Sequence, residues 1–164
     1  MKQRLLIVLF TCIIATSVSA QIQRKFYGLT LGVSTKSEVL IQFENKGAFE
    51  QSPDGHETVC VRNLRFGGYS WDVVVFRFYN DKLFNVLFMD LKEYPSTDSN
   101  KWENIKKTLD EKYIDYKNVT SENSFSYIDE YTYLACNHDG KNVCLGYADI
   151  LLNEKISQKE KDEF

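Results

Sequence analysis

The sequence predicts an α+β protein in which helices pack on one face of an antiparallel meander sheet. Two segments have the apolar spacing of amphipathic helices, and each is followed by runs of β-branched and aromatic residues separated by turn residues. Because this order occurs twice, we expect one helix-plus-strands unit, loosely repeated. The chain contains only two prolines and no low-complexity linker, so we expect a single domain over residues 21–152.

The first twenty residues have the pattern of an export signal. Lys2 and Arg4 give a basic start, an apolar run occupies residues 5–15, and Val18-Ser19-Ala20 forms a small-residue cleavage site before Gln21. The apolar run is shorter than a membrane-spanning helix. We therefore expect cleavage of residues 1–20, no stable membrane insertion afterwards, and a periplasmic or secreted product.

Cys12 raises the question of a lipid anchor, because bacterial lipoproteins are cut directly before a cysteine. The preceding Leu9-Phe10-Thr11 lacks the small residue that such a site requires, which favours a soluble product over a lipid-anchored one. Cleavage takes two of the 20 basic residues and leaves 18 against 23 acidic residues, a net charge of −5. This balance does not favour nucleic acid or an anionic membrane as the partner.

Three cysteines remain after cleavage: Cys60, Cys136 and Cys144. In an oxidising compartment, this odd number allows at most one internal disulfide. If the turn between the last two is centred on Gly140, Cys136 and Cys144 face each other on one side of a hairpin and can form a disulfide. A register shifted by one residue would exclude the bond. The other interpretation is that all three are small buried hydrophobic residues.

The first helix is predicted to begin after Thr35. Thr35 and Glu38 form a capping-box pattern that satisfies free amides of the first turn. Val39 and Phe43 then give an apolar face, and Gly47 is placed to end the helix in a left-handed conformation.

Three strands are expected next, at residues 58–66, 69–79 and 83–91, with turns at Gly67-Gly68 and Asn80-Asp81. If the second turn includes Lys82, one face of the ribbon places Val74, Phe76 and Phe78 opposite Phe88, Val86 and Phe84. The other face carries Val73, Val75, Leu87 and Met89 beside Arg77 and Asn85. An antiparallel sheet usually leaves one face in water, so we expect another part of the chain, or a partner, to cover part of this second apolar face.

A polar break around Pro95 separates the second unit, which begins with a helix predicted over residues 102–113. Trp102, Ile105, Leu109 and Tyr113 recur at helical spacing. The charged residues fall mostly elsewhere on the helical wheel: Lys101, Lys106, Lys107, Glu111 and Lys112. A hairpin of residues 125–136 and 142–152 should follow. Residues 153–164 are highly charged and predict a solvated helix or tail.

The segment Phe26-Tyr27-Gly28-Leu29-Thr30-Leu31-Gly32-Val33-Ser34-Thr35-Lys36-Ser37-Glu38-Val39, with the strands after it, resembles the SmpA/OmlA (BamE) and beta-lactamase-inhibitor-protein-like fold group of small exported proteins. The resemblance covers about residues 26–91 and extends to uncharacterised secreted proteins of gut-type Bacteroidetes. The chain departs from the pattern in one extra residue between Gly32 and Val39, in the absence of a proline after Gly47, and in lacking the lipoprotein cysteine. The resemblance implies the fold and the binding of proteins through a sheet surface.

Catalytic signatures are scarce in the sequence. The two histidines, His56 and His138, lie in turns beside Glu57 and Asp139, and they could share a metal only if those loops meet. The chain has no His-x-x-x-His or Cys-x-x-Cys spacing, no Gly-x-Ser-x-Gly elbow and no phosphate-binding loop. We therefore expect no catalytic residue, no metal and no cofactor.

The function expected from the sequence is that of an exported, non-catalytic binding or scaffold module with a protein partner. An inhibitor of a secreted enzyme and a small hydrolase are the alternatives. Aromatic residues dominate protein–protein hot spots, so the candidate contact residues are Tyr69, Trp71, Tyr131, Tyr133 and Tyr147. The other interpretation is that these aromatics pack under the second helix.

Overall fold

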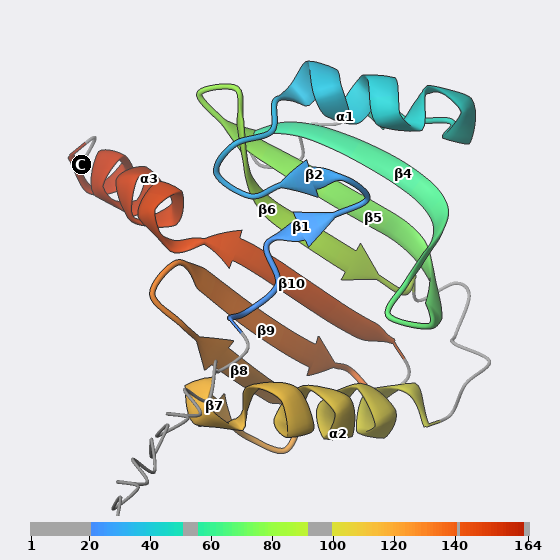
Figure 1. The fold of residues 1–164 in the computed structure, drawn as a ribbon, viewed down its shortest axis with the longest axis vertical. Coiled ribbons are helices and arrows are strands. Elements are labelled where there is room, and N and C mark those ends of the chain that lie inside the picture. Colours follow the sequence, from blue (N-terminus) through green and yellow to red (C-terminus); the bar gives the residue numbers. More distant parts are fainter. Residues whose placement is uncertain (1–20, 51–55, 92–99, 141, 163–164) are drawn as a thin grey trace, which may run out of the picture.

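The protein forms a large antiparallel sheet with helices packed against it (Figure 1). The computed structural model describes residues 21–50, 56–91, 100–140 and 142–162. The expected export signal and the polar break around Pro95 lie outside the described residues. Within the described part, three α-helices accompany an eight-stranded antiparallel sheet, which confirms the α+β class.

The repeat is more complete than the sequence predicted. The first unit contains α1 (Lys36–Phe43), the 3₁₀ helix η1 (Glu44–Lys46), β3 (Phe49–Glu50), β4 (Glu57–Phe66), β5 (Tyr69–Tyr79) and β6 (Lys82–Met89). The second unit contains α2 (Lys101–Tyr113), η2 (Ile114–Tyr116), β7 (Lys117–Thr120), β8 (Ser124–Ile128), β9 (Thr132–His138) and β10 (Val143–Asp149). A small hairpin of β1 (Lys25–Phe26) and β2 (Leu29–Thr30) precedes these units, and α3 (Ile150–Asp162) follows them.

The strand order follows from the repeat. The order across the sheet is β3-β4-β5-β6-β10-β9-β8-β7, so each unit contributes four adjacent strands, and the last strands of the two units pair at the centre. That central pair is antiparallel, with Leu145 opposite Phe88 and Tyr147 opposite Val86. The second unit is therefore turned end for end relative to the first within one continuous sheet.

One face of the sheet is covered by α1, α2 and the β1–β2 hairpin, which lie side by side in front of the strands in Figure 1. A single hydrophobic core joins this layer to the strands. Phe43 of α1 contacts the ring of Phe76, and Trp102 of α2 contacts the ring of Phe125. Phe26 of the hairpin lies between the two helices, with its ring 4.7 Å from that of Tyr147. The covering layer thus consists of three separate pieces.

The sequence signals of the first unit are confirmed in detail. Thr35 and Glu38 form the reciprocal capping box, and Gly47 adopts φ 67°, the left-handed conformation that a glycine accepts at low cost. The expected pairs Val74–Phe88 and Phe76–Val86 are present. An irregularity after Arg77, however, places Leu83 opposite Phe78.

The prediction that Phe84 faces Phe78 is therefore wrong. The register shift between Arg77 and Phe78 moves every later residue of the pair by one position. Leu83 joins the core, and the ring of Phe84 contacts that of His56.

Two boundaries of the second unit also differ from prediction. The single strand expected over residues 125–136 is divided into β8 and β9 by a turn. The Asp129 carboxylate accepts hydrogen bonds from the backbone N–H groups of Tyr131 and Thr132 and so stabilises that turn. The last strand ends at Asp149, whose carboxylate accepts the Leu152 N–H and caps α3 three residues before the predicted boundary at residue 153.

The second face of the sheet carries the apolar residues that the ribbon pattern placed there. Val73 pairs with Met89, and Val75 pairs with Leu87, on the side away from the core. Val73 is buried and the other three are half-buried. Covering of this face by a partner stays a prediction.

The N-terminal segment is tied to the second unit. The Ile22 N–H donates to the Asp129 carboxylate at 2.8 Å, and Arg24 pairs with Asp149 at the end of β10. Gly32 is required here, because a Cβ at this position would lie 2.6 Å from Oδ2 of Asp149 and its φ is +77°. These contacts hold residues 22–32 across the ends of β8, β9 and β10.

Candidate functional site

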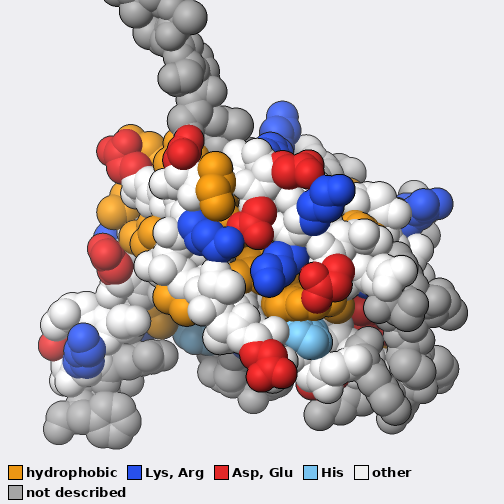
Figure 2. Space-filling view, turned by 90° about the horizontal axis from the view of Figure 1, so that it is seen from below, with side chains coloured by type: hydrophobic (Ala, Val, Ile, Leu, Met, Phe, Trp, Pro, Cys, Tyr) orange, Lys and Arg blue, Asp and Glu red, His pale blue; other side chains and the backbone are white. Residues whose placement is uncertain are grey.

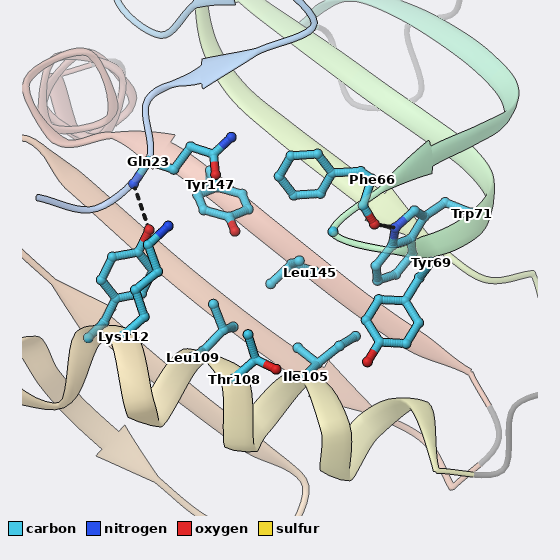
Figure 3. Close-up of a pocket in the computed structure, with 12 residues that line it drawn as sticks. Gln23, Phe66, Tyr69, Trp71, Ile105, Thr108, Leu109, Lys112, Leu145 and Tyr147 are labelled. Carbon is cyan, nitrogen blue, oxygen red and sulfur yellow. Dashed lines mark hydrogen bonds between the residues drawn. The ribbon is translucent and has the colours of Figure 1, made fainter. Parts of the chain in front are cut away.

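The best-formed pocket lies between α2 and the turn that joins β4 to β5 (Figure 3). Its volume is about 130 Å³. Buried Trp71, Leu145 and Tyr147 form its floor, and Ile105 and Leu109 of α2 form one wall. The pocket is therefore an apolar recess on the helix-covered face of the sheet.

The lining of the pocket comes from separate segments of the chain. Helix α2, which packs on β8 through the contact of Trp102 with Phe125, provides one side. The end of β4, its turn and the start of β5 provide the opposite side, and Gln23 of the N-terminal segment lies at the edge. Leu145 and Tyr147 of β10 lie between them.

The mouth of the pocket is exposed. Gly67 at the β4–β5 turn and Thr108 and Lys112 on α2 lie at the surface. The Thr108 hydroxyl donates to the Asn104 carbonyl at 2.8 Å, and the Lys112 ammonium lies 4.9 Å from the centre of the Tyr113 ring. Among the described lining residues, Lys112 is the single charged one, so the mouth of the pocket is weakly basic.

The Tyr147 phenol is the unusual feature of the floor. The residue is 3% exposed, and its hydroxyl makes no hydrogen bond within the part of the chain that the structure describes. Figure 3 shows this hydroxyl directed into the pocket, toward Leu145 and Leu109. Burial raises the pKa of the Tyr147 phenol above its usual value near 10, so the group is neutral at physiological pH.

A second phenol at the edge of the pocket is already paired. The Tyr113 hydroxyl accepts the Gln23 N–H at 3.2 Å, which fixes the N-terminal segment beside the pocket. Tyr113 and Tyr147 therefore differ in role, because one anchors the chain and the other leaves a hydrogen-bonding group open to the pocket.

The pocket can supply contact surface and hydrogen bonds. Its described lining residues include no carboxylate, imidazole or thiol, which are the usual general bases and metal ligands. The arrangement suits binding of a small apolar group with one polar atom.

The structure brings three of the five candidate aromatics together. Trp71 and Tyr147 are buried in the floor, and half-buried Tyr69 lies at the edge of the pocket (Figure 3). Tyr131 and Tyr133 are 40% and 39% exposed and lie at and just after the β8–β9 turn, outside the pocket lining.

Several lining residues were not singled out from the sequence as site residues, namely Gln23, Phe66, Thr108 and Lys112. Phe66 precedes the Gly67-Gly68 turn, and that position at the end of a strand is the signal that could have placed it at the pocket mouth. Thr108 and Lys112 are three and seven residues after Ile105, so helical periodicity puts them beside the apolar face of α2.

Of the two interpretations of the cysteines, the structure contradicts the possible disulfide between Cys136 and Cys144. Cys136 lies opposite Leu145, and Cys144 lies opposite Asn137, so the two side chains point to opposite faces of the hairpin. The turn is centred between residues 140 and 141, which shifts the register by one position from that expected. Among the described residues, neither of them forms a disulfide, and neither does Cys60. Burial raises the pKa of the Cys136 and Cys144 thiols, which disfavours the reactive thiolate.

The two histidines lie in different units. His56 is beside Phe84 of β6, and His138 stacks on Trp102 of α2 with 4.2 Å between the ring centres. Within the described ranges, no three His, Cys, Asp or Glu side chains gather as a metal site would require.

A second recess, of about 420 Å³, lies beside the β9–β10 turn and is lined by polar groups including Asp90 and His138. Its main charge is already paired, because Asp90 holds the ammonium of Lys101 at 2.7 Å. We therefore regard the apolar pocket as the stronger candidate for a binding site.

The surface on the α2 side carries acidic and basic side chains interspersed with hydrophobic ones (Figure 2). This view has no large area of one sign of charge, unlike the basic surfaces of nucleic-acid-binding proteins. Among the described helices, none is both long enough and apolar enough to cross a bilayer.

Comparison with known proteins does not supply a relative. No family model, no curated protein and no solved structure matches the chain.

Proposed function

We propose that the protein is an exported, non-catalytic binding module that recognises a partner protein through the pocket beside α2. The supporting observation is the Tyr147 hydroxyl, which faces an apolar recess and makes no hydrogen bond to another described residue. When a ligand excludes water from such a recess, a polar group left without a hydrogen bond costs about 1–3 kcal/mol. A ligand that pairs with this hydroxyl avoids that cost.

The size of the pocket favours one side chain as the group that enters it. A recess of about 130 Å³ is too small for most free metabolites, whose sites are usually 300–1,000 Å³, but it accommodates a single ring or branched chain. Protein–protein interfaces concentrate their free energy in such buried anchor side chains. Export is supported by the pattern of residues 1–20.

The inhibitor alternative is a special case of this proposal, in which the partner is a secreted enzyme. The hydrolase alternative has no support from the pocket, because its described lining residues offer no nucleophile with an adjacent base.

Export is tested by N-terminal sequencing of the protein isolated from the cell envelope or the medium. We expect a mature chain that begins at Gln21. A protein recovered only from the cytoplasm with residues 1–20 intact would contradict the proposal.

Partner binding is tested by crosslinking capture with two matched variants of the mature protein. Thr108→Trp places a large ring at the pocket mouth, whereas Lys107→Trp places the same ring on the exposed side of α2. We expect wild type and Lys107→Trp to capture the same envelope protein, and Thr108→Trp to lose it. Capture that is equal for all three proteins, or absent for all three, would refute the pocket as the recognition site.

A further inference from the structure

The pocket matches one six-membered ring in size. An apolar protein cavity of about 150 Å³ holds a benzene molecule, and this pocket measures about 130 Å³. The lining offers aromatic partners for such a ring in Phe66 and Trp71, and flat aliphatic contacts in Ile105 and Leu145. Aromatic pairs contribute about 0.5–1.5 kcal/mol beyond the area that they bury.

The Tyr147 hydroxyl in the floor favours a ring that carries a polar group. The Tyr147 hydroxyl can donate one hydrogen bond and accept others, and it uses neither capacity within the described chain. A hydrocarbon ring would fill the space and leave this hydroxyl unpaired and shielded from water. A ring that carries its own hydroxyl would fill the same space and pair with Tyr147 as donor or acceptor.

We propose that the pocket binds one phenol ring, whose hydroxyl enters first and forms a hydrogen bond with Tyr147. This inference rests on the proposed binding function and names the group that is recognised. The substituent opposite the hydroxyl then points out between Gly67 and Thr108. A tyrosine side chain of a partner and a free para-substituted phenol share this chemistry.

A second phenol under α2 pairs with a polar group of the chain itself. The Tyr127 hydroxyl donates to the Asp110 carboxylate at 2.9 Å under the same helix, where its ring packs beside Tyr113. The Tyr147 hydroxyl has no such partner among the described residues, so the ligand would supply the polar group.

Titration calorimetry of the mature protein with p-cresol and with toluene tests the inference. These probes differ only in the hydroxyl. A net hydrogen bond of about 1 kcal/mol corresponds to about fivefold in affinity, so we expect p-cresol to bind at least about fivefold more tightly than toluene. Equal or tighter binding of toluene, or no binding of p-cresol at millimolar concentration, would overturn the inference.

The variant Tyr147→Phe removes the hydroxyl and keeps the ring. We expect its preference for p-cresol over toluene to disappear, while Tyr133→Phe, a matched change at an exposed position outside the pocket lining, retains it. Persistence of the preference in Tyr147→Phe would refute the role of this phenol. If Tyr147→Phe does not fold, Thr108→Trp tests the inference instead. This variant blocks the mouth of the pocket and must abolish p-cresol binding.

N-acetyl-tyrosinamide separates the two sources of the ring. Binding of both this compound and p-cresol supports a tyrosine of a protein partner. Binding of p-cresol alone supports the phenol pocket and contradicts the protein partner. Pocket-dependent capture of an envelope protein without binding of either phenol would overturn the inference and leave the proposed function intact.

Discussion

Lys101 shows how one side chain connects the two units. Its side chain is 3% exposed, and its ammonium donates to the Asp90 carboxylate at 2.7 Å and to the Ser70 carbonyl at 2.9 Å and lies 3.6 Å from the centre of the Trp71 ring. The helical wheel grouped this lysine with the solvent-exposed charges of α2. It is buried because Asp90, which directly follows β6, provides its counter-charge. Helical periodicity carries no information about that contact.

We predict that Lys101→Met lowers the free energy of unfolding by about 3–5 kcal/mol, because it leaves the buried Asp90 carboxylate without its cation. Urea denaturation measures the change. Lys36→Met is the matched control, because Lys36 pairs with the exposed carboxylates of Glu50 and Glu57. We expect it to lower the free energy of unfolding by less than about 1 kcal/mol. Similar losses for the two variants would contradict the role assigned to Lys101.

The buried phenols predict a loss of stability in alkali. Burial raises the pKa of Tyr27 to about 12 and that of Tyr147 also above 10. Their contribution is complete below the unfolded pKa near 10 and is lost as the pH rises, because the unfolded chain ionises first. Each such phenol lowers the free energy of unfolding by up to about 1.4 kcal/mol per pH unit above 10.

We expect Tyr147→Phe to lose less unfolding free energy than wild type between pH 10 and pH 11, as measured by urea denaturation at each pH. Between pH 7 and pH 9 the two proteins should change in parallel, which serves as the internal control. A parallel loss above pH 10 as well would show that Tyr147 ionises equally easily in the folded and unfolded states.

Secondary-structure elements were predicted well where their signals are local. The capping box at Thr35 and Glu38 and the Gly67-Gly68 turn depend on neighbouring residues only. The division of the expected strand at Asp129 also had a local signal, because adjacent Asp129 and Glu130 interrupt an apolar run. The register shift after Arg77 had none, since it depends on which of two partner residues fits the core.

The register of the β9–β10 hairpin predicts the behaviour of the cysteines. We expect three free thiols when the mature protein is denatured without reductant and alkylated, as counted by mass spectrometry. In the native protein, Cys136 should react more slowly than Cys144, because it is 1% exposed whereas Cys144 is half-buried. A mass two hydrogens lower, with a linked Cys136–Cys144 peptide, would contradict the assigned register.

At the scale of the whole molecule, the N-terminal segment holds the covering layer in place. Arg24 donates to the Tyr131 carbonyl, the Thr132 hydroxyl and the Leu31 carbonyl, and pairs with Asp149. None of these contacts has a sequence pattern, because their partners lie up to 125 residues apart. The same reason explains why the pocket was not predicted, since its lining residues come from segments that are distant in the sequence.

We predict that Arg24→Met lowers the free energy of unfolding by about 3 kcal/mol and speeds hydrogen exchange in the β1–β2 hairpin, because it leaves Asp149 buried and unpaired. Hydrogen-exchange mass spectrometry and urea denaturation measure the two effects. Lys25→Met, at an adjacent exposed position, is the control and should change either quantity little. Unchanged exchange in Arg24→Met would mean that other contacts secure the hairpin.

The end-for-end arrangement of the two units also determines how the sheet terminates. Within the described ranges, each unit begins with its shortest strand, so the outer edges are β3, with two described residues, and β7, with four residues and an irregular pairing after Lys117. Long, regular edge strands can pair with strands of other molecules, whereas short or irregular edge strands make such pairing unfavourable. The repeat therefore protects both sides of the sheet against edge-to-edge aggregation by the same means.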